Sequence, residues 1–78
     1  MSSDLREALQ KELEIEKARP AEEVADSVRD TYPDISLEDA QRIKDGLIAI
    51  MTARTRADLR RHGRAYKALH AELKRKYK

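Results

Sequence analysis

Apolar residues recur along this chain at three- and four-residue steps, the spacing that places them on one face of an α-helix. Leu5, Leu9 and Leu13 show this pattern near the N-terminus, and no stretch alternates in the manner of a β-strand. We therefore expect an all-α protein, a three- or four-helix bundle that forms a single domain. The expected helices cover about residues 4–18, 21–31, 37–61 and 64–76, within one domain of residues 1–78.

Polar residues and prolines mark where these helices begin and end. Ser3 suits the N-cap of the first helix, and Pro20 suits the first turn of the second because its missing N–H costs nothing there. Pro33 biases the preceding residue away from helical dihedrals and closes the second helix. Ser36 is the expected N-cap of the third helix, and Asp39 completes a pattern that resembles a capping box with a shorter acid.

The third and fourth predicted helices share one apolar stripe. Its members follow one another at three- or four-residue steps: Ile48, Met51, Thr55, Leu59, His62, Tyr66, Leu69, Leu73 and Tyr77. Gly63 lies within this stripe, and the cations before it are typical of the last turn of a helix. Because glycine costs only roughly 1 kcal/mol in a helix interior, we favour a continuous or gently kinked helix over a break near Gly63.

Residues 47–51 are apolar on every side of the predicted helix. Such a segment needs cover all round, so we expect it at the centre of the core or at a subunit interface. A chain of 78 residues without cysteine builds only a small core. We therefore predict a homo-oligomer, with a dimer favoured, that associates through residues 43–59. The residues expected at this interface are Leu47, Ile48, Ile50, Met51 and Leu59.

The net charge of +2 conceals a strong division along the chain. Residues 1–53 hold seven basic and thirteen acidic side chains, whereas residues 54–78 hold ten basic and two acidic ones. Like charges four residues apart mildly destabilise a helix, so this arrangement favours an anionic partner. The residues expected to bind it are Arg54, Arg56, Arg60, Arg61, Arg64, Lys67, Lys74 and Arg75.

Four partners suit a basic amphipathic helix. The chain's own acidic half is one, if a neighbouring helix brings Glu12, Glu14 and Glu16 to the arginines. An acidic protein that receives the helix in a groove is the second, and nucleic acid is the third, because arginine suits phosphate. A membrane surface fits less well because Trp and Phe are absent. We hypothesise a protein-interaction or regulatory module, with nucleic-acid binding through residues 54–78 as the alternative.

The sequence offers no catalytic or cofactor chemistry. Cysteine is absent, and His62 and His70 lie about 12 Å apart on one helix, too far for a shared metal ion. Glu22, Asp26 and Asp30 align on a helix but lack the histidine partners of a carboxylate-bridged metal site. Phosphate-binding glycine loops and nucleophile motifs are also absent. We therefore expect a protein that is not an enzyme and binds no cofactor or metal.

The expected location is the cytoplasm. The N-terminus lacks the apolar segment of a signal peptide, and the longest apolar run, residues 47–51, is far shorter than a membrane span. A chain without cysteine also suits a reducing compartment.

Residues 32–40 resemble the turn and helix near the N-terminus of the 2-keto-4-pentenoate hydratase and oxalocrotonate decarboxylase family. The resemblance covers nine residues, Tyr-Pro-Asp-Ile-Ser-Leu-Glu-Asp-Ala. Any proline turn followed by a serine cap and an acidic first turn produces such a string, so it carries no function over to this chain.

Overall fold

The structure, a computed structural model, describes the backbone of residues 2–77 and the side chains of residues 4–77. That part of the chain holds four helices and no strand: α1 (Ser2–Ala18), α2 (Ala21–Val28), α3 (Leu37–Met51) and α4 (Arg56–Lys76). The predicted all-α fold is therefore confirmed. The predicted Ser3 cap involves a side chain outside the described ones. Helix α2 ends three residues earlier than predicted, because residues 29–31 form a turn that leads into Tyr32 and Pro33.

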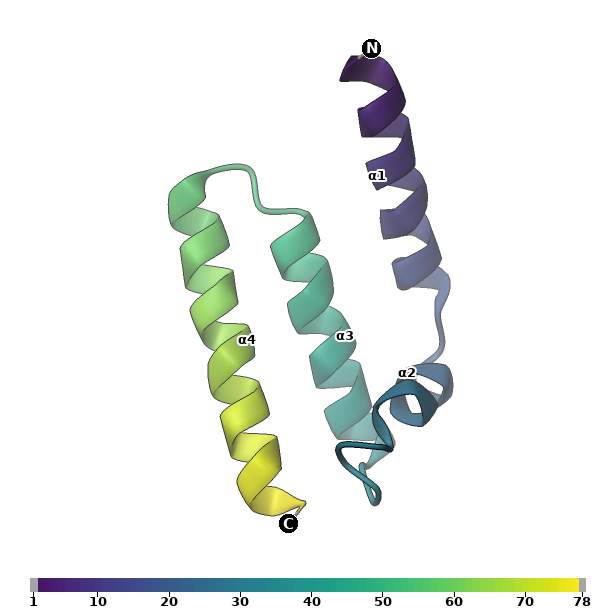
Figure 1. Cartoon of the computed structure of the whole chain (residues 1–78), viewed down its shortest axis with the longest axis vertical. Helices are drawn as coiled ribbons and strands as arrows, with labels where there is room; N and C mark the ends of the chain where they lie inside the picture. The colour runs from purple at the N-terminus through teal and green to yellow at the C-terminus, as the bar shows by residue number, and fades with distance from the viewer. Residues whose placement is uncertain (1, 78) are drawn as a thin grey trace.

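Three of the helices, α1, α3 and α4, lie side by side, and α3 runs antiparallel to the other two (Figure 1). The short α2 packs against α3, near its N-terminal end. Within the described residues, α3 contacts each of the other helices, which make no comparable contacts with one another. The molecule measures 45 × 26 × 17 Å. Because α1, α3 and α4 do not overlap when the molecule is viewed down its shortest axis (Figure 1), these three helices form a single layer.

The buried core lies at one end of this layer. There α2 and the turn after it meet the start of α3 and the end of α4 (Figure 1). The buried apolar residues are Val24, Ala25, Tyr32, Ile35, Ala40, Ile43 and Leu73. Of the two places predicted for residues 47–51, the centre of the core is wrong, because all five stay partly exposed. A subunit interface, the other place, stays a prediction. Neighbours in a single layer cover a helix on its flanks and leave its other sides open.

The chain turns back on itself between α3 and α4, and Gly63 lies inside α4. The Thr52 hydroxyl donates to the Ile48 carbonyl at 2.9 Å as α3 ends, and the Thr55 Oγ accepts the Asp58 N–H at 3.0 Å as α4 begins. The prediction of one continuous helix, or of a break near Gly63, is therefore wrong. Folding back at residues 52–55 brings the apolar stripe of α4 onto α3, which a straight helix would leave in water.

A glycine allows α3 and α4 to approach closely. A Cβ on Gly46 would lie 3.0 Å from the Cδ2 of the Tyr66 ring, whereas a Cβ on Gly63 would meet nothing within 4 Å. Further along the hairpin, Leu73 is fully buried. Burying a leucine side chain contributes about 1.5–3 kcal/mol. These contacts fix which side of α4 faces the protein and which faces away.

No helix within residues 2–77 combines the length and the apolar character needed to cross a membrane.

Candidate anion-binding surface on helix α4

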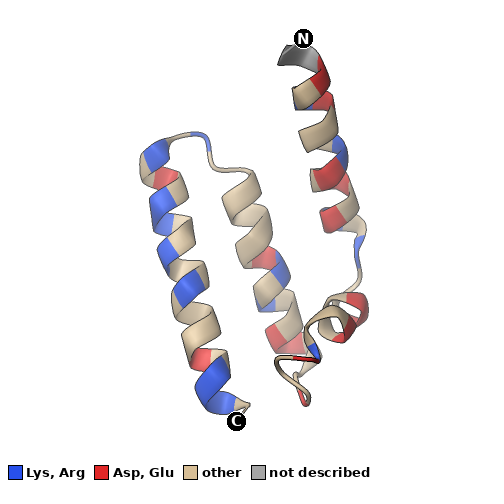
Figure 2. Cartoon of the chain, viewed as in Figure 1, with Lys and Arg blue, Asp and Glu red and all other residues tan. Residues whose placement is uncertain are grey.

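Helix α4 has two sides of different chemistry. Its apolar side carries Tyr66, Leu69 and Leu73, which pack on the core. Because a helix turns once in 3.6 residues, five cations fall within an arc of about 80° on another side. These are Arg56, Arg60, Arg64, Lys67 and Lys74, and all five are exposed. Helix α4 is thus attached to the protein by one side and presents a row of cations on another (Figure 2).

All eight cations predicted to bind an anionic partner are exposed, and we call them together the basic face: Arg54, Arg56, Arg60, Arg61, Arg64, Lys67, Lys74 and Arg75. Arg54 lies in the turn before α4, while Arg61 and Arg75 lie beside the row of five. From the first residue of that row to the last, the helix rises about 27 Å. The basic face is therefore long and narrow, suited to an extended partner.

Few charges of the basic face are neutralised within the protein. Arg61 forms an ion pair with Asp58 at 3.2 Å. Among residues 4–77, the other seven members of the basic face form no ion pair. The Nε of Arg75 donates to the uncharged Ala71 carbonyl at 3.5 Å.

The acidic first helix does not supply the missing partners. Helix α1 contacts α3 and makes no such contact with α4 within the described residues. Glu16, the acid of α1 that turns inward, pairs with Arg19 at 3.4 Å. Within the described residues, the acids of α1 therefore do not neutralise the basic face.

The apolar stripe of α4 is engaged by its own chain. Leu73 is fully buried, and Tyr66, Leu69 and Tyr77 pack against the core. A partner that received α4 in a groove would have to separate it from α3. The hypothesis that an acidic protein receives α4 in a groove therefore lacks free apolar residues in this part of the helix, because these residues already pack against the core.

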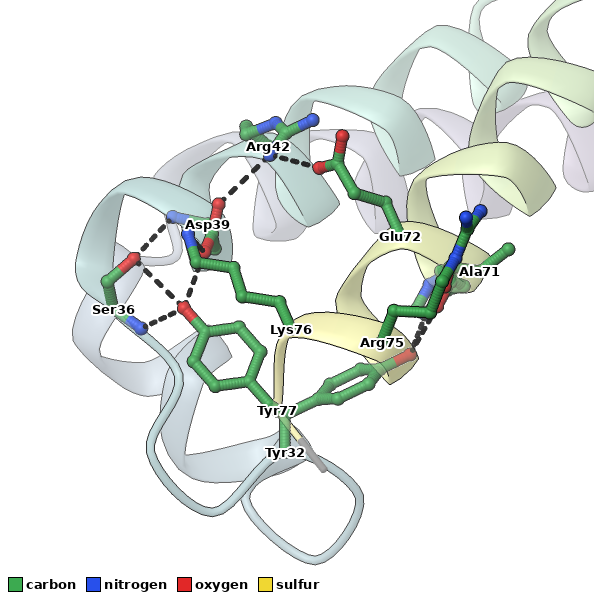
Figure 3. A network of polar contacts seen from close by, with 10 residues as sticks. Tyr32, Ser36, Asp39, Arg42, Ala71, Glu72, Arg75, Lys76 and Tyr77 are labelled. Atoms are coloured by element: carbon green, nitrogen blue, oxygen red, sulfur yellow. Dashed lines mark hydrogen bonds and ion pairs between the residues drawn. The ribbon is translucent and has the colours of Figure 1, made fainter.

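A polar network, which we call the clasp, fastens the end of α4 to the start of α3 (Figure 3). At its centre lies Asp39, which is 2% exposed. Its Oδ2 accepts from the Lys76 Nζ at 2.7 Å and from the Tyr77 hydroxyl at 2.5 Å, and its Oδ1 accepts from Arg42 at 3.0 Å. Arg42 also pairs with Glu72 at 2.7 Å. These donors satisfy a carboxylate that burial would otherwise destabilise.

Tyr77 also completes the N-terminal cap of α3. The Ser36 Oγ accepts the Asp39 N–H at 3.1 Å, which confirms the predicted cap. In a capping box the acid would accept the N–H of the capping serine. Here the Tyr77 hydroxyl accepts the Ser36 N–H at 3.1 Å, and the Asp39 carboxylate binds Lys76 instead. Sequence reasoning missed the clasp because Ser36 and Tyr77 are 41 residues apart and no local pattern links them.

The clasp changes the acidity of its central carboxyl. Hydrogen bonds from Lys76 and Tyr77 hold the pKa of Asp39 well below its ordinary value of 3.8, although burial acts in the opposite direction. The same contact raises the pKa of Lys76 above 10.5. Both groups are therefore charged at neutral pH, and the clasp is a fixed ion pair under those conditions.

A second long-range contact lies beside the clasp. The Tyr32 hydroxyl is 2.7 Å from the Nδ1 of His70, and the two rings stack with centroids 5.8 Å apart. Burial, followed by the charge of Lys74, lowers the pKa of His70 below 6.5. The lowered pKa favours the neutral imidazole, and the Tyr32 hydroxyl and the His70 Nδ1 share one hydrogen bond. His70 serves the packing of α4 in this arrangement.

The described residues hold no group of three or more His, Asp or Glu side chains placed to bind a metal ion. Glu22, Asp26 and Asp30 are all exposed, and Asp26 forms an ion pair with Arg29.

The structure gathers the five predicted self-association residues at one end of the α3–α4 hairpin. Leu47, Ile48, Ile50 and Met51 are partly exposed at the end of α3, and Leu59 in the first turns of α4 is 47% exposed. This end lies opposite the buried core (Figure 1).

The chain matches no protein-family model, and comparison with curated proteins and with solved structures gives no match either.

Proposed function

We propose that this protein is a non-catalytic module that binds nucleic acid through the basic face of α4. The observation that carries the proposal is the row of five exposed cations, about 27 Å long, that form no ion pair among the described residues. Cations that neutralise phosphates release condensed counterions, and this release drives sequence-independent binding. Arginine outnumbers lysine on the basic face, which suits bidentate contacts to phosphate oxygens.

An acidic protein is the second candidate partner, and it would make the chain a protein-interaction or regulatory module. The observation in its favour is that no aromatic side chain lies within the row of cations to stack on bases. However, protein interfaces usually depend on a few buried aromatic or apolar anchors. The neutral residues beside the cations are Ala57, Ala68 and Ala71, while Tyr66, Leu69, Leu73 and Tyr77 pack against the core. We therefore place nucleic acid first, which reverses the order that the sequence alone favoured.

The decisive experiment is a salt-dependent titration of a generic 20-base-pair DNA duplex and a matching RNA duplex. If four to six phosphates are neutralised, affinity should fall by about 10²–10³-fold between 50 and 200 mM salt. The triple variant Arg60→Gln, Arg64→Gln, Lys67→Gln should flatten the slope of log K against log salt by about 2–3.

The matched control also replaces three basic residues by Gln and removes three positive charges, but it removes them from α1: Arg6→Gln, Lys11→Gln, Lys17→Gln. This control should bind with nearly the slope of the wild type, because only the basic face contacts phosphate. Absence of binding to both duplexes at 50 mM salt would reject the nucleic-acid proposal. If polyglutamate binds instead, and the triple α4 variant abolishes that binding, the acidic-protein candidate takes its place.

The chain lacks cysteine and suits a reducing compartment, so we propose the cytoplasm as the location of this activity.

A further inference from the structure

Half of the helical layer has no buried core, and apolar side chains are exposed there. We call this region the open surface: Leu5 and Leu9 of α1, residues 47–51 of α3, and Leu59 of α4. Leu5 is 65% exposed and Leu9 is 59% exposed. Helix α1 extends past the end of α3, so its first turns have no neighbour in the layer (Figure 1).

The exposed leucines of α1 continue the side that it turns towards α3. Leu13 and Glu16 are partly buried, and on a helix they share an arc of about 80° with Leu5 and Leu9. The inward side of α1 therefore runs on as an apolar strip beyond its last contact. The open surface combines this strip with the partly exposed end of α3.

The surface area of the chain shows how much is left uncovered. A compact protein of 9.0 kDa exposes about 4,900 Å², whereas this chain exposes 6125 Å². Its radius of gyration is 13.8 Å, against about 11.5 Å for a compact domain of this length. A standard interface buries about 800 Å² of each partner. The excess of about 1,200 Å² is larger than that, so a dimer would bring each chain close to ordinary compactness.

The apolar character of the open surface favours a second copy of the chain as the partner. Residues 47–51 at its centre are apolar on every side of α3 and stay partly exposed. A two-fold axis that stacks one layer on another places this centre against itself, so apolar side chains of one copy meet apolar side chains of the other.

We propose that the protein forms a two-fold symmetric dimer in which the open surfaces of two copies cover each other. Two stacked layers of helices then enclose the apolar side chains that one layer leaves exposed, as domains generally require. The predicted interface of Leu47, Ile48, Ile50, Met51 and Leu59 is thereby extended by Leu5 and Leu9. Binding of nucleic acid by the basic face is a separate property and does not depend on this dimer.

The test is the mass of the full chain by sedimentation equilibrium between 1 and 200 μM. We expect the wild type to approach twice 9.0 kDa at the higher concentrations. The variant Leu5→Gln, Leu9→Gln should weaken dimerisation by at least tenfold, because polar amides replace two apolar side chains at the interface. Leu37→Gln is the matched control: Leu37 is 49% exposed but lies at the other end of α3.

Because the replaced leucines are exposed, each variant should keep the helical circular dichroism of the wild type. A wild-type mass of 9.0 kDa at every concentration would overturn the proposal, as would a dimer that the paired leucine variant leaves unchanged. Neither result would affect the salt-dependent titration of the basic face, so the two proposals fail independently.

Discussion

Asp39 shows how a single residue joins two ends of the fold. Its carboxylate is almost fully buried, yet it keeps its charge because Lys76, Tyr77 and Arg42 donate to it. The sequence identifies Asp39 only as an acid in the first turn of a helix. Its role in holding α4 depends on partners 37 and 38 residues away, and helical periodicity contains no information about such distances.

Replacing Asp39 should reveal the contribution of the clasp as a function of pH. At pH 7, Asp39→Asn should lower the free energy of unfolding by about 1.5–3 kcal/mol, the usual effect of losing a hydrogen bond to a charged group. The pKa of Asp39 is lower in the folded protein than its ordinary 3.8. Its contribution is therefore complete above pH 4 and is lost as pH falls through the folded-state pKa.

Urea unfolding of the wild type and Asp39→Asn at pH 7 and at pH 3 measures this effect. The difference between the two proteins should shrink at the lower pH. The control is Asp34→Asn, since Asp34 is exposed in the turn before α3 and should have little effect at either pH. A difference that is equally large at both pH values would contradict a stabilising carboxylate.

At the scale of single helices, local chemistry predicts more than periodicity does. The Ser36 cap of α3 and the start of α2 directly after Pro20 follow from residues beside them in the sequence, whereas α2 ends before Pro33 is reached. The break at residues 52–55 had a signal of the same kind, because Thr55 and Asp58 form a Thr-x-x-Asp pattern at the start of α4. The unbroken apolar stripe concealed it. The stripe predicts which residues lie on the same side of a helix. It does not distinguish one straight helix from two helices joined by a turn, because the same residues form the stripe in both.

The two glycines give a direct test of how α3 and α4 pack. Gly63→Ala should raise the free energy of unfolding by about 0.5–1 kcal/mol, because alanine favours the helix and a Cβ there meets nothing within 4 Å. Gly46→Ala gains the same propensity but displaces the Tyr66 ring, 3.0 Å away. We expect it to be at least about 1 kcal/mol less stable than Gly63→Ala. Equal unfolding free energies for the two variants would mean that Tyr66 does not lie on Gly46.

At the scale of the whole molecule, the three long helices form one layer, and this determines what the sequence was able to predict. The all-α fold and the exposure of the basic face follow from composition and periodicity. The sequence also shows that residues 47–51 are apolar on every side. However, such a segment can be covered either in the core or at a subunit interface, and the sequence does not distinguish the two. Only the arrangement of the layer shows that the chain's own core lies elsewhere, around Tyr32 and Leu73.

Dimer formation predicts that thermal stability depends on concentration. If folding and association are coupled, a 100-fold increase in protein concentration should raise the Tm of the wild type by about 5–10 °C. Leu37→Gln should show the same rise, and Leu5→Gln, Leu9→Gln should not. Scanning calorimetry at 5 and 500 μM provides the measurement. A wild-type Tm that is independent of concentration would argue for a monomeric folding unit.

The long-range contacts of Asp39 and Tyr32 also determine when this protein can fold during synthesis. Both residues leave the ribosome well before their partners, which lie between His70 and Tyr77. Until that segment has emerged, the nascent chain has neither the clasp nor Leu73 to complete the core, and its apolar residues stay accessible. The domain therefore acquires its native structure only after nearly all of α4 has emerged from the ribosome.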